Sequence, residues 1–289
     1  MTSSDQIDLQ ISSLLQRLGV GGPREIIDEL DDIPMPEIEL ALERLVRQGD
    51  LELIQSPGRA YRVARPRIDW ARHAGKVTVI HNDPIDIMAD AHKACNLHPA
   101  VEHANLEAVF SALVGGAQEQ LQIISPFIDS RALSRFSDDF EKSFARHIEF
   151  TLVGRGILVR EDSTRPRQYE ERIDALQNLW DSYKRNNPDD PTHFEIRDYL
   201  RFVPPPAENL RARGAIAASV HHKIIVQDRK WAYVGSGEFR NHSFGATGEA
   251  GVLLDGPHAK MLSDLVQCYA RRGLPVDPLE LDALRGGSS

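Results

Sequence analysis

Apolar residues recur at helical spacing near the start of the chain. Ile7 and Ile11 lie on one face of a segment that ends at Leu18, before Gly19. The pattern predicts helices over residues 7–18, 24–31 and 36–48 and two short strands over 51–54 and 60–63, around Ser56-Pro57-Gly58. Three helices followed by a hairpin is the order of a winged helix-turn-helix, to which we assign residues 1–64.

From residue 104 onward, apolar strands alternate with amphipathic helices. We expect strands over residues 121–124, 148–153, 193–203, 219–227, 231–236 and 249–254, and helices over 104–118, 130–145, 168–186 and 257–272. This alternation predicts an α/β domain, a mixed sheet covered by helices on both faces, over residues 104–275. Residues 276–289 are assigned to a C-terminal tail. Residues 65–103 are assigned to a connector with a strand near 77–80 and a helix near 84–95.

The composition is that of a globular protein, with 41% hydrophobic and 27% charged residues. The sequence contains neither a run of eighteen apolar residues nor a secretory signal, so we expect a cytoplasmic protein with no membrane partner. The only cysteines, Cys95 and Cys268, lack metal-ligand spacing. They predict neither a disulfide nor a zinc site.

The formal net charge of -9 is unevenly distributed, because residues 1–58 hold twelve acidic residues and four arginines. Acidic residues on helix 36–48, such as Glu37 and Glu43, would repel DNA phosphates. We therefore favour a protein partner or dimerisation for residues 1–64 over DNA reading. The next stretch is basic and either follows a phosphate backbone or is a solvated linker. It contains Arg59, Arg62, Arg65, Arg67, Arg72 and Lys76, with Tyr61 and Trp70 between them.

Candidate chemistry lies in the stretch Val220-His221-His222-Lys223, which opens an apolar strand. Side chains alternate along a strand, so His221 and Lys223 are expected on one face and His222 on the other. A neutral imidazole can attack phosphorus while a nearby ammonium binds the non-bridging oxygens. The pair therefore suits a phosphodiester substrate.

The spacing H-x-K-x4-D-x6-G-S, with an acid thirteen residues after the serine, resembles the phospholipase D superfamily. The resemblance covers about residues 104–272, including Ser125-Pro126-Phe127-Ile128-Asp129 at the end of the first strand. It implies a two-step displacement through a covalent phosphohistidine, with no metal ion and no cofactor. Its catalytic residues would be His221 as nucleophile, Lys223 and Ser236 holding phosphate oxygens, Glu249 orienting His221, and Asp228 serving the geometry of the site.

The chain carries one copy of this motif, whereas the chemistry of the superfamily uses two histidines. The resemblance therefore implies a homodimer in which His221 of each chain enters a shared site. One position departs from the family pattern, because Glu238 stands where the family usually has an asparagine that binds phosphate. Either Arg240 or Asn241 supplies the lost donor, or Glu238 turns away from the substrate.

The favoured function is that of a nuclease, because a polar segment rich in arginine, beginning at Arg155, is expected near the site. One alternative is a nucleic-acid-binding scaffold or sensor with weak or no catalysis, of the kind found in defence complexes. A second is a phospholipase, for which the sequence offers no interfacial apolar stretch. The residues expected to touch substrate are Arg155, Glu238, Arg240 and Asn241.

Overall fold

The computed structural model describes residues 3–18, 21–48, 50–54, 60–63, 68, 70–82, 103–158, 166–202, 216–244 and 247–286. The helix expected near 84–95 lies outside these residues. So do several of the basic residues noted above and one cysteine, namely Arg59, Arg65, Arg67 and Cys95.

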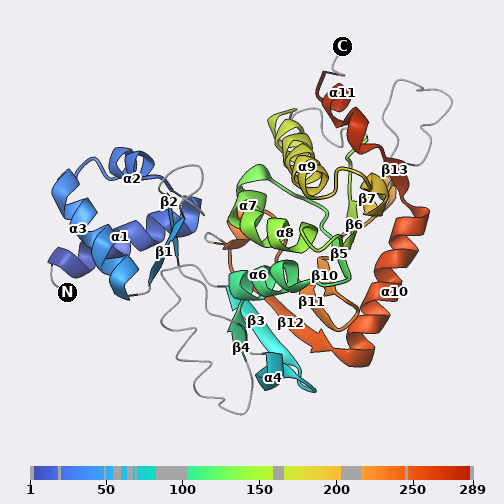
Figure 1. The fold of residues 1–289 in the computed structure, drawn as a ribbon, viewed down its shortest axis with the longest axis horizontal. Helices are drawn as coiled ribbons and strands as arrows, with labels where there is room; N and C mark the ends of the chain where they lie inside the picture. The colour runs from blue at the N-terminus through green and yellow to red at the C-terminus, as the bar shows by residue number, and fades with distance from the viewer. Residues whose placement is uncertain are drawn as a thin grey trace.

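The N-terminal module has the predicted order of elements. Its helices are α1 (Ser3–Leu18), α2 (Pro23–Glu29) and α3 (Met35–Gln48), and its antiparallel strands are β1 (Leu51–Ile54) and β2 (Ala60–Val63). Ile11, Ile26 and Ile38 are fully buried in a core separate from that of the sheet. Figure 1 shows the module to one side of the sheet. The module is thus an independent packing unit, and its assignment as a winged helix remains a prediction.

The predicted mixed α/β architecture is confirmed. A nine-stranded sheet has the order β13-β7-β6-β5-β10-β11-β12-β3-β4, in which β3 with β4, β5 with β6, and β6 with β7 are parallel and the remaining pairs are antiparallel. The strands are β3 (Thr78–Asn82), β4 (His103–Asn105), β5 (Gln120–Ile124), β6 (Glu149–Gly154), β7 (Phe194–Asp198), β10 (Ile224–Gln227), β11 (Trp231–Gly235), β12 (Glu249–Asp255) and β13 (Leu274–Val276).

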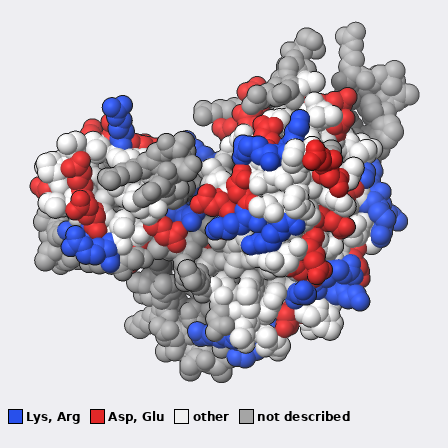
Figure 2. Space-filling model, viewed as in Figure 1, with Lys and Arg blue, Asp and Glu red and all other residues white. Residues whose placement is uncertain are grey.

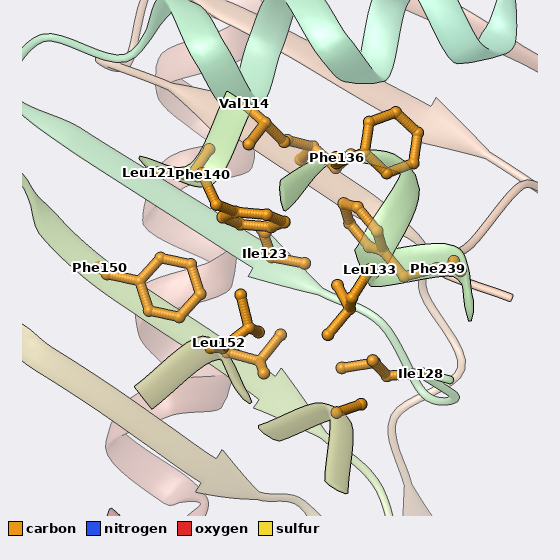
Figure 3. Close-up of a cluster of buried hydrophobic side chains, with 14 of the residues drawn as sticks. Val114, Leu121, Ile123, Ile128, Leu133, Phe136, Phe140, Phe150, Leu152 and Phe239 are labelled. Carbon is orange, nitrogen blue, oxygen red and sulfur yellow. The ribbon is translucent and has the colours of Figure 1, made fainter. Parts of the chain in front are cut away.

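Helices cover both faces of this sheet because successive strand residues bury their side chains on opposite sides. Ile123 and Leu152 pack under Phe136, Phe140 and Phe239, as Figure 3 shows. Helix α10 (Gly256–Arg272) lies along the opposite face (Figure 1). Its apolar stripe is buried against the sheet. The face that carries Ile123 and Leu152 is covered by four helices, α6 (Leu106–Gly116), α7 (Ser130–Arg135), α8 (Ser137–Phe144) and α9 (Pro166–Asn186).

Three sequence assignments need correction. Residues 65–103 are more than a connector, because β3 pairs with β12 and β4 extends the sheet beyond it. Residues 276–289 are more than a tail, because β13 pairs with β7, and α11 (Leu281–Gly286) packs on α9 with Leu281 fully buried. The strand expected over 219–227 is interrupted. Its first part, β9 (Ile216–Ser219), pairs with β8 (Leu200–Phe202) in a separate two-stranded sheet.

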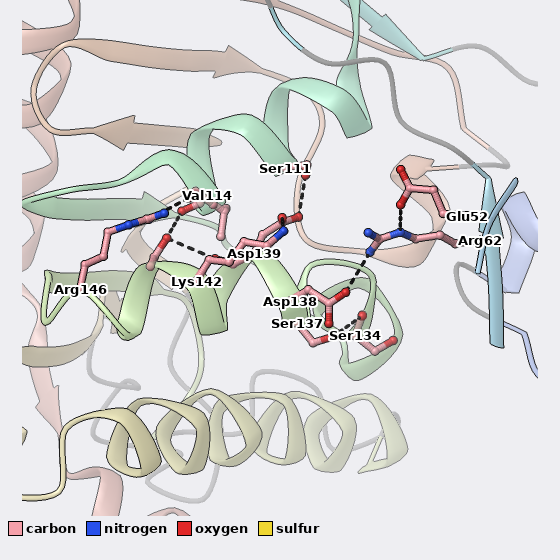
Figure 4. A network of polar contacts seen from close by, with 12 residues as sticks. Glu52, Arg62, Ser111, Val114, Ser134, Ser137, Asp138, Asp139, Lys142 and Arg146 are labelled. Atoms are coloured by element: carbon pink, nitrogen blue, oxygen red, sulfur yellow. Dashed lines mark hydrogen bonds and ion pairs between the residues drawn. The ribbon is translucent and has the colours of Figure 1, made fainter. Parts of the chain in front are cut away.

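The N-terminal module contacts the sheet domain beside α8. The Arg62 guanidinium lies 2.7 Å from Glu52 within the module and 3.6 Å from Asp138 at the start of α8 (Figure 4). Helix α1 also contacts η3 (Asn241–Phe244), a short 3-10 helix of the sheet domain. Acidic and basic side chains are interspersed over the face seen in Figure 2. Among the described residues, no helix is long and apolar enough to span a bilayer.

Candidate active site

The sheet topology brings the candidate residues to one edge. Strand β10 is antiparallel to β5, with Ile224 opposite Ile124, so the start of β10 lies beside the carboxyl end of β5. Gly235 at the end of β11 pairs with Gly251 near the start of β12. The segments that meet here are residues 125–129 after β5, 155–158 after β6, 220–223 before β10 and 236–240 after β11.

His221 and Lys223 lie together at this edge. The Lys223 Nζ is 3.2 Å from His221 Nδ1 and 3.3 Å from Nε2, and it donates a hydrogen bond of 3.1 Å to the His221 carbonyl. Backbone hydrogen bonds from Val220 N to Tyr199 O and from Gly235 N to Lys223 O hold both ends of the segment. The structure therefore brings the two together as expected, although residues 220–223 lie outside any strand.

The neighbouring histidine points elsewhere. His222 Nε2 lies 3.0 Å from the Tyr269 hydroxyl on α10, and its ring packs against the Tyr269 ring. His221 itself is exposed. The expected alternation of the two histidine side chains is thus present.

The charge environment keeps His221 neutral. The Lys223 ammonium lowers the pKa of His221 below its ordinary value of 6.5, and partial burial, Arg155 and His222 act in the same direction. Only the neutral imidazole has a lone pair for attack. At neutral pH the ring is therefore in the form that a nucleophile requires.

Ser236 and Glu249 are joined across the start of β12. The Ser236 hydroxyl donates to Glu249 Oε2 at 2.5 Å, and the Ser243 hydroxyl donates to Glu249 Oε1 at 2.8 Å. No hydrogen bond joins the described side chains of Glu249 and His221, so in this structure Glu249 does not fix the tautomer of the ring. Ser243, on η3, is part of this hydrogen-bond network, and the spacing of the motif does not predict its presence.

Asp228 lies at the opposite end of β10. It is buried, and its Oδ1 accepts backbone hydrogen bonds from Gln118, Glu119 and Gln120 at 3.1, 2.8 and 3.0 Å. Asp228 and Arg229 are the central residues of the β10–β11 turn, with positive φ values of 52° and 55°. The carboxylate therefore fixes the turn before β5 and does not face the reacting group.

Glu238 is held inside the site instead of turning away. Its side chain is 10% exposed, and its Oε1 lies 4.0 Å from the Arg240 guanidinium. Burial raises the pKa of Glu238 to about 7, and the negative charge of Glu249 adds to this, while Lys223, Arg240 and the Phe127 N–H oppose it. Asn241 faces away, because its side-chain oxygen accepts hydrogen bonds from Arg135 at 3.2 Å.

Three guanidinium groups surround the Phe127 ring. The central carbons of Arg155, Arg172 and Arg240 lie 5.8, 5.5 and 5.3 Å from its centroid. Arg172 donates to the carbonyls of Arg155 and Gly156, and Asp198 accepts the backbone N–H groups of Gly156, Ile157 and Leu158. The loop that carries Arg155 is thus fixed from two sides, and the site has a cationic, aromatic wall.

No family model matches the sequence, and no curated protein is significantly similar to it. The chain is similar to solved structures that include a phospholipase D family member, Nuc, from Salmonella typhimurium, with a TM-score of 0.44 and 13% identity over 70% of this chain and 97% of that one. NucT from Helicobacter pylori gives a TM-score of 0.42 and 11% identity over 70% of this chain and all of that one. Phosphatidylserine synthase from Haemophilus influenzae gives 0.48 and 10% over 87% of this chain and 50% of that one. The chemistry of the site rests on this chain's own residues.

Proposed function

We propose that this protein is a phosphodiesterase that cleaves nucleic acids, with His221 as the nucleophile. The observation that carries the proposal is the position of the Lys223 ammonium, 3.2 to 3.3 Å from both ring nitrogens of an exposed histidine. This ammonium keeps the ring neutral and can bind a phosphate oxygen when substrate enters. Arg155, which also lowers the pKa of His221, adds positive charge at the same edge.

The reaction proceeds in two displacements. A ring nitrogen of the neutral His221 bonds to phosphorus as the bond to the leaving oxygen breaks, and that oxygen takes a proton from the imidazolium form of His221 of the partner subunit. The two rings thus share one proton, and the pair titrates as a unit. Water then attacks the phosphohistidine, gives its proton to the same partner histidine, and the phosphorus–nitrogen bond breaks. A homodimer is part of the proposal because one chain supplies one such histidine.

A nucleic-acid substrate is favoured by the wall at Phe127. An aromatic ring among arginines offers stacking to bases and positive charge to a phosphate backbone. A lipid substrate lacks a comparable observation among the described residues. A binding protein with little catalysis remains the second candidate, because the buried Glu238 carboxyl places an acid beside the phosphate site.

The test is incubation of the purified protein in EDTA with labelled DNA, labelled RNA and bis(p-nitrophenyl) phosphate. Cleavage should disappear in His221→Ala and persist in His222→Ala, a matched control because His222 faces Tyr269. Nucleic-acid binding without cleavage by the wild type would support the second candidate. Cleavage that survives in His221→Ala would overturn the mechanism.

A further inference from the structure

The backbone around Glu238 is held in place residue by residue. Six consecutive amides, from Ser236 to Asn241, each donate a hydrogen bond. Their acceptors are in order Ala250 O, Tyr233 Oη, Ser243 Oγ, Ser125 Oγ, Glu238 O and Asp129 Oδ2, at 2.7 to 3.4 Å. The Glu238 carboxyl therefore cannot leave the site by a small rearrangement of its loop.

One oxygen of this carboxyl is buried without a partner. Glu238 Oε2 has no hydrogen-bond partner among the described residues, whereas Oε1 faces Arg240 at 4.0 Å. An ionised buried carboxyl with an unsatisfied oxygen is costly, while a neutral one carries a proton that it can donate to a ligand. The described residues offer no acceptor for the proton of a neutral Glu238 carboxyl, and a phosphate oxygen would be one.

The charged and titratable groups around this carboxyl come from three elements besides its own loop. Lys223 lies before β10, Tyr233 on β11 and Glu249 at the start of β12, and Arg240 is on the same loop. The two cations favour the ionised form and Glu249 disfavours it. Because burial is the largest influence, the neutral form persists to about pH 7.

We propose that Glu238 is a phosphate-binding residue controlled by its own proton. When neutral, the carboxyl rotates about its side-chain bonds and donates its O–H to a non-bridging oxygen of the phosphate that Lys223 holds, as an amide would, while its backbone stays in place. When ionised, it repels that phosphate and closes the site to substrate. The inference rests on the proposed function for the identity of the ligand, and it concerns the binding step alone.

The size of the expected effect follows from the fraction of neutral carboxyl. With a pKa of about 7, only about 3% of the molecules carry a neutral Glu238 at about pH 8.5. If only these bind phosphate, the apparent Kd at about pH 8.5 is about 30-fold weaker than at about pH 5.5. The Tyr233 hydroxyl does not contribute to this change, because burial raises its pKa well above the range tested.

The experiment measures binding of dimethyl phosphate, whose single negative charge is constant over this range of pH. His221→Ala is the background, since it removes both turnover and the titration of the imidazole. In that background the Kd should weaken about 30-fold between about pH 5.5 and 8.5, and adding Glu238→Gln should reduce the change to less than about twofold. Glu149→Gln is the matched charge control, because Glu149 begins β6 at the end of the strand far from the site. This variant should keep the full change in Kd.

An equal pH dependence with and without Glu238→Gln would overturn the proposal, and so would absence of dimethyl phosphate binding at every pH. Glu238→Asn provides a second neutral variant if the first does not fold. Failure of the proposed function is seen separately, as absence of bis(p-nitrophenyl) phosphate cleavage despite pH-controlled binding. Cleavage that depends on His221, combined with dimethyl phosphate binding whose pH dependence is unchanged in both neutral variants, would instead reject the proton control and leave the function standing.

Discussion

The Lys223 ammonium serves two purposes at the residue scale. Without substrate it is the largest influence that lowers the pKa of His221. With substrate it would neutralise part of the negative charge on the phosphate oxygens, as a positioned cation does in phosphoryl transfer. One side chain thus prepares the nucleophile and binds the group that the nucleophile attacks.

Lys223→Gln removes the charge and keeps a polar chain of similar length. The pKa of His221 should rise toward 6.5, because Lys223 is the first cause of its decrease. An NMR titration of the His221 ring protons measures this change. His222→Ala should raise the same pKa less, since His222 is the smallest of the causes, and an unchanged value in Lys223→Gln would contradict the assigned electrostatics.

Glu238 makes stability depend on pH. Its pKa is about 7 in the folded protein against an ordinary 4.5, so between these values the folded state keeps a proton that the unfolded chain has released. Its contribution to stability therefore falls as pH rises from about 4.5 to 7, by up to about 3 kcal/mol. In urea unfolding, the free energy of unfolding of Glu238→Gln relative to that of the wild type should increase by an amount of this order between pH 5 and 8. A difference between the two proteins that does not change with pH would refute the raised pKa.

The sequence identifies several site residues but not their neighbours. His221, Lys223 and Ser236 follow from the spacing of one motif, because short separations along paired strands determine which residues meet at a sheet edge. Ser243 and the ring of Phe127 could not be assigned to the site, since their contacts with Glu249 and Arg155 depend on how loops fold over the edge. The burial of Glu238 likewise depends on packing from other elements.

At the scale of elements, the errors of the sequence analysis are strands whose partners are distant in sequence. Strand β3 pairs with β12, about 170 residues later, so the local pattern alone could not place it in the sheet. The sequence suggests one strand over residues 219–227, yet β9, which ends at Ser219, pairs with β8, while β10 pairs with β5 and β11. Tertiary pairing, not local propensity, divides the run.

Substitutions of Asp228 test whether the two ends of β10 have separate roles, one in stability and the other in the reaction. Asp228→Ala leaves the backbone N–H groups of residues 118–120 without their acceptor and should destabilise the protein by about 3 kcal/mol in urea unfolding. Cleavage per folded molecule should stay unchanged, because His221 lies at the other end of the strand. Asp228→Asn keeps one acceptor oxygen and tolerates the positive φ, so it should lose less stability; a specific loss of turnover in either variant would place Asp228 in the reaction.

At the scale of the whole molecule, the homodimer can be tested by mixing subunits. Wild type and His221→Ala coexpressed in equal amounts give about half of the wild-type chains a variant partner. If each site needs two copies of His221, activity per wild-type chain should fall by about half. Activity that stays proportional to the amount of wild type would show that one chain works alone.

The N-terminal module illustrates how far sequence patterns extend. The order and bounds of its five elements follow closely from the apolar pattern, because its core is built from residues near in sequence. The way the module docks on the sheet domain cannot be predicted from this pattern. Arg62 contacts Asp138 and α1 contacts η3, and no sequence feature marks these surfaces as partners. That contact places the acidic module next to the helix that carries Ser243, and a protein partner of residues 1–64 remains our proposal.

The turn between β10 and β11 offers a reserve of stability. Arg229 adopts a positive φ of 55°, which disfavours a side chain, and its ion pair with Asp264 is exposed and so contributes little. Asp-Gly is a preferred pair for such a hairpin. Relief of this conformation is worth about 1–2 kcal/mol, and the extra entropy that glycine loses on folding offsets about 0.5–1 kcal/mol of it. Arg229→Gly should therefore raise the free energy of unfolding by about 0.5–1 kcal/mol, a gain measurable in urea. Destabilising substitutions at the catalytic edge could then be compared in this more stable background.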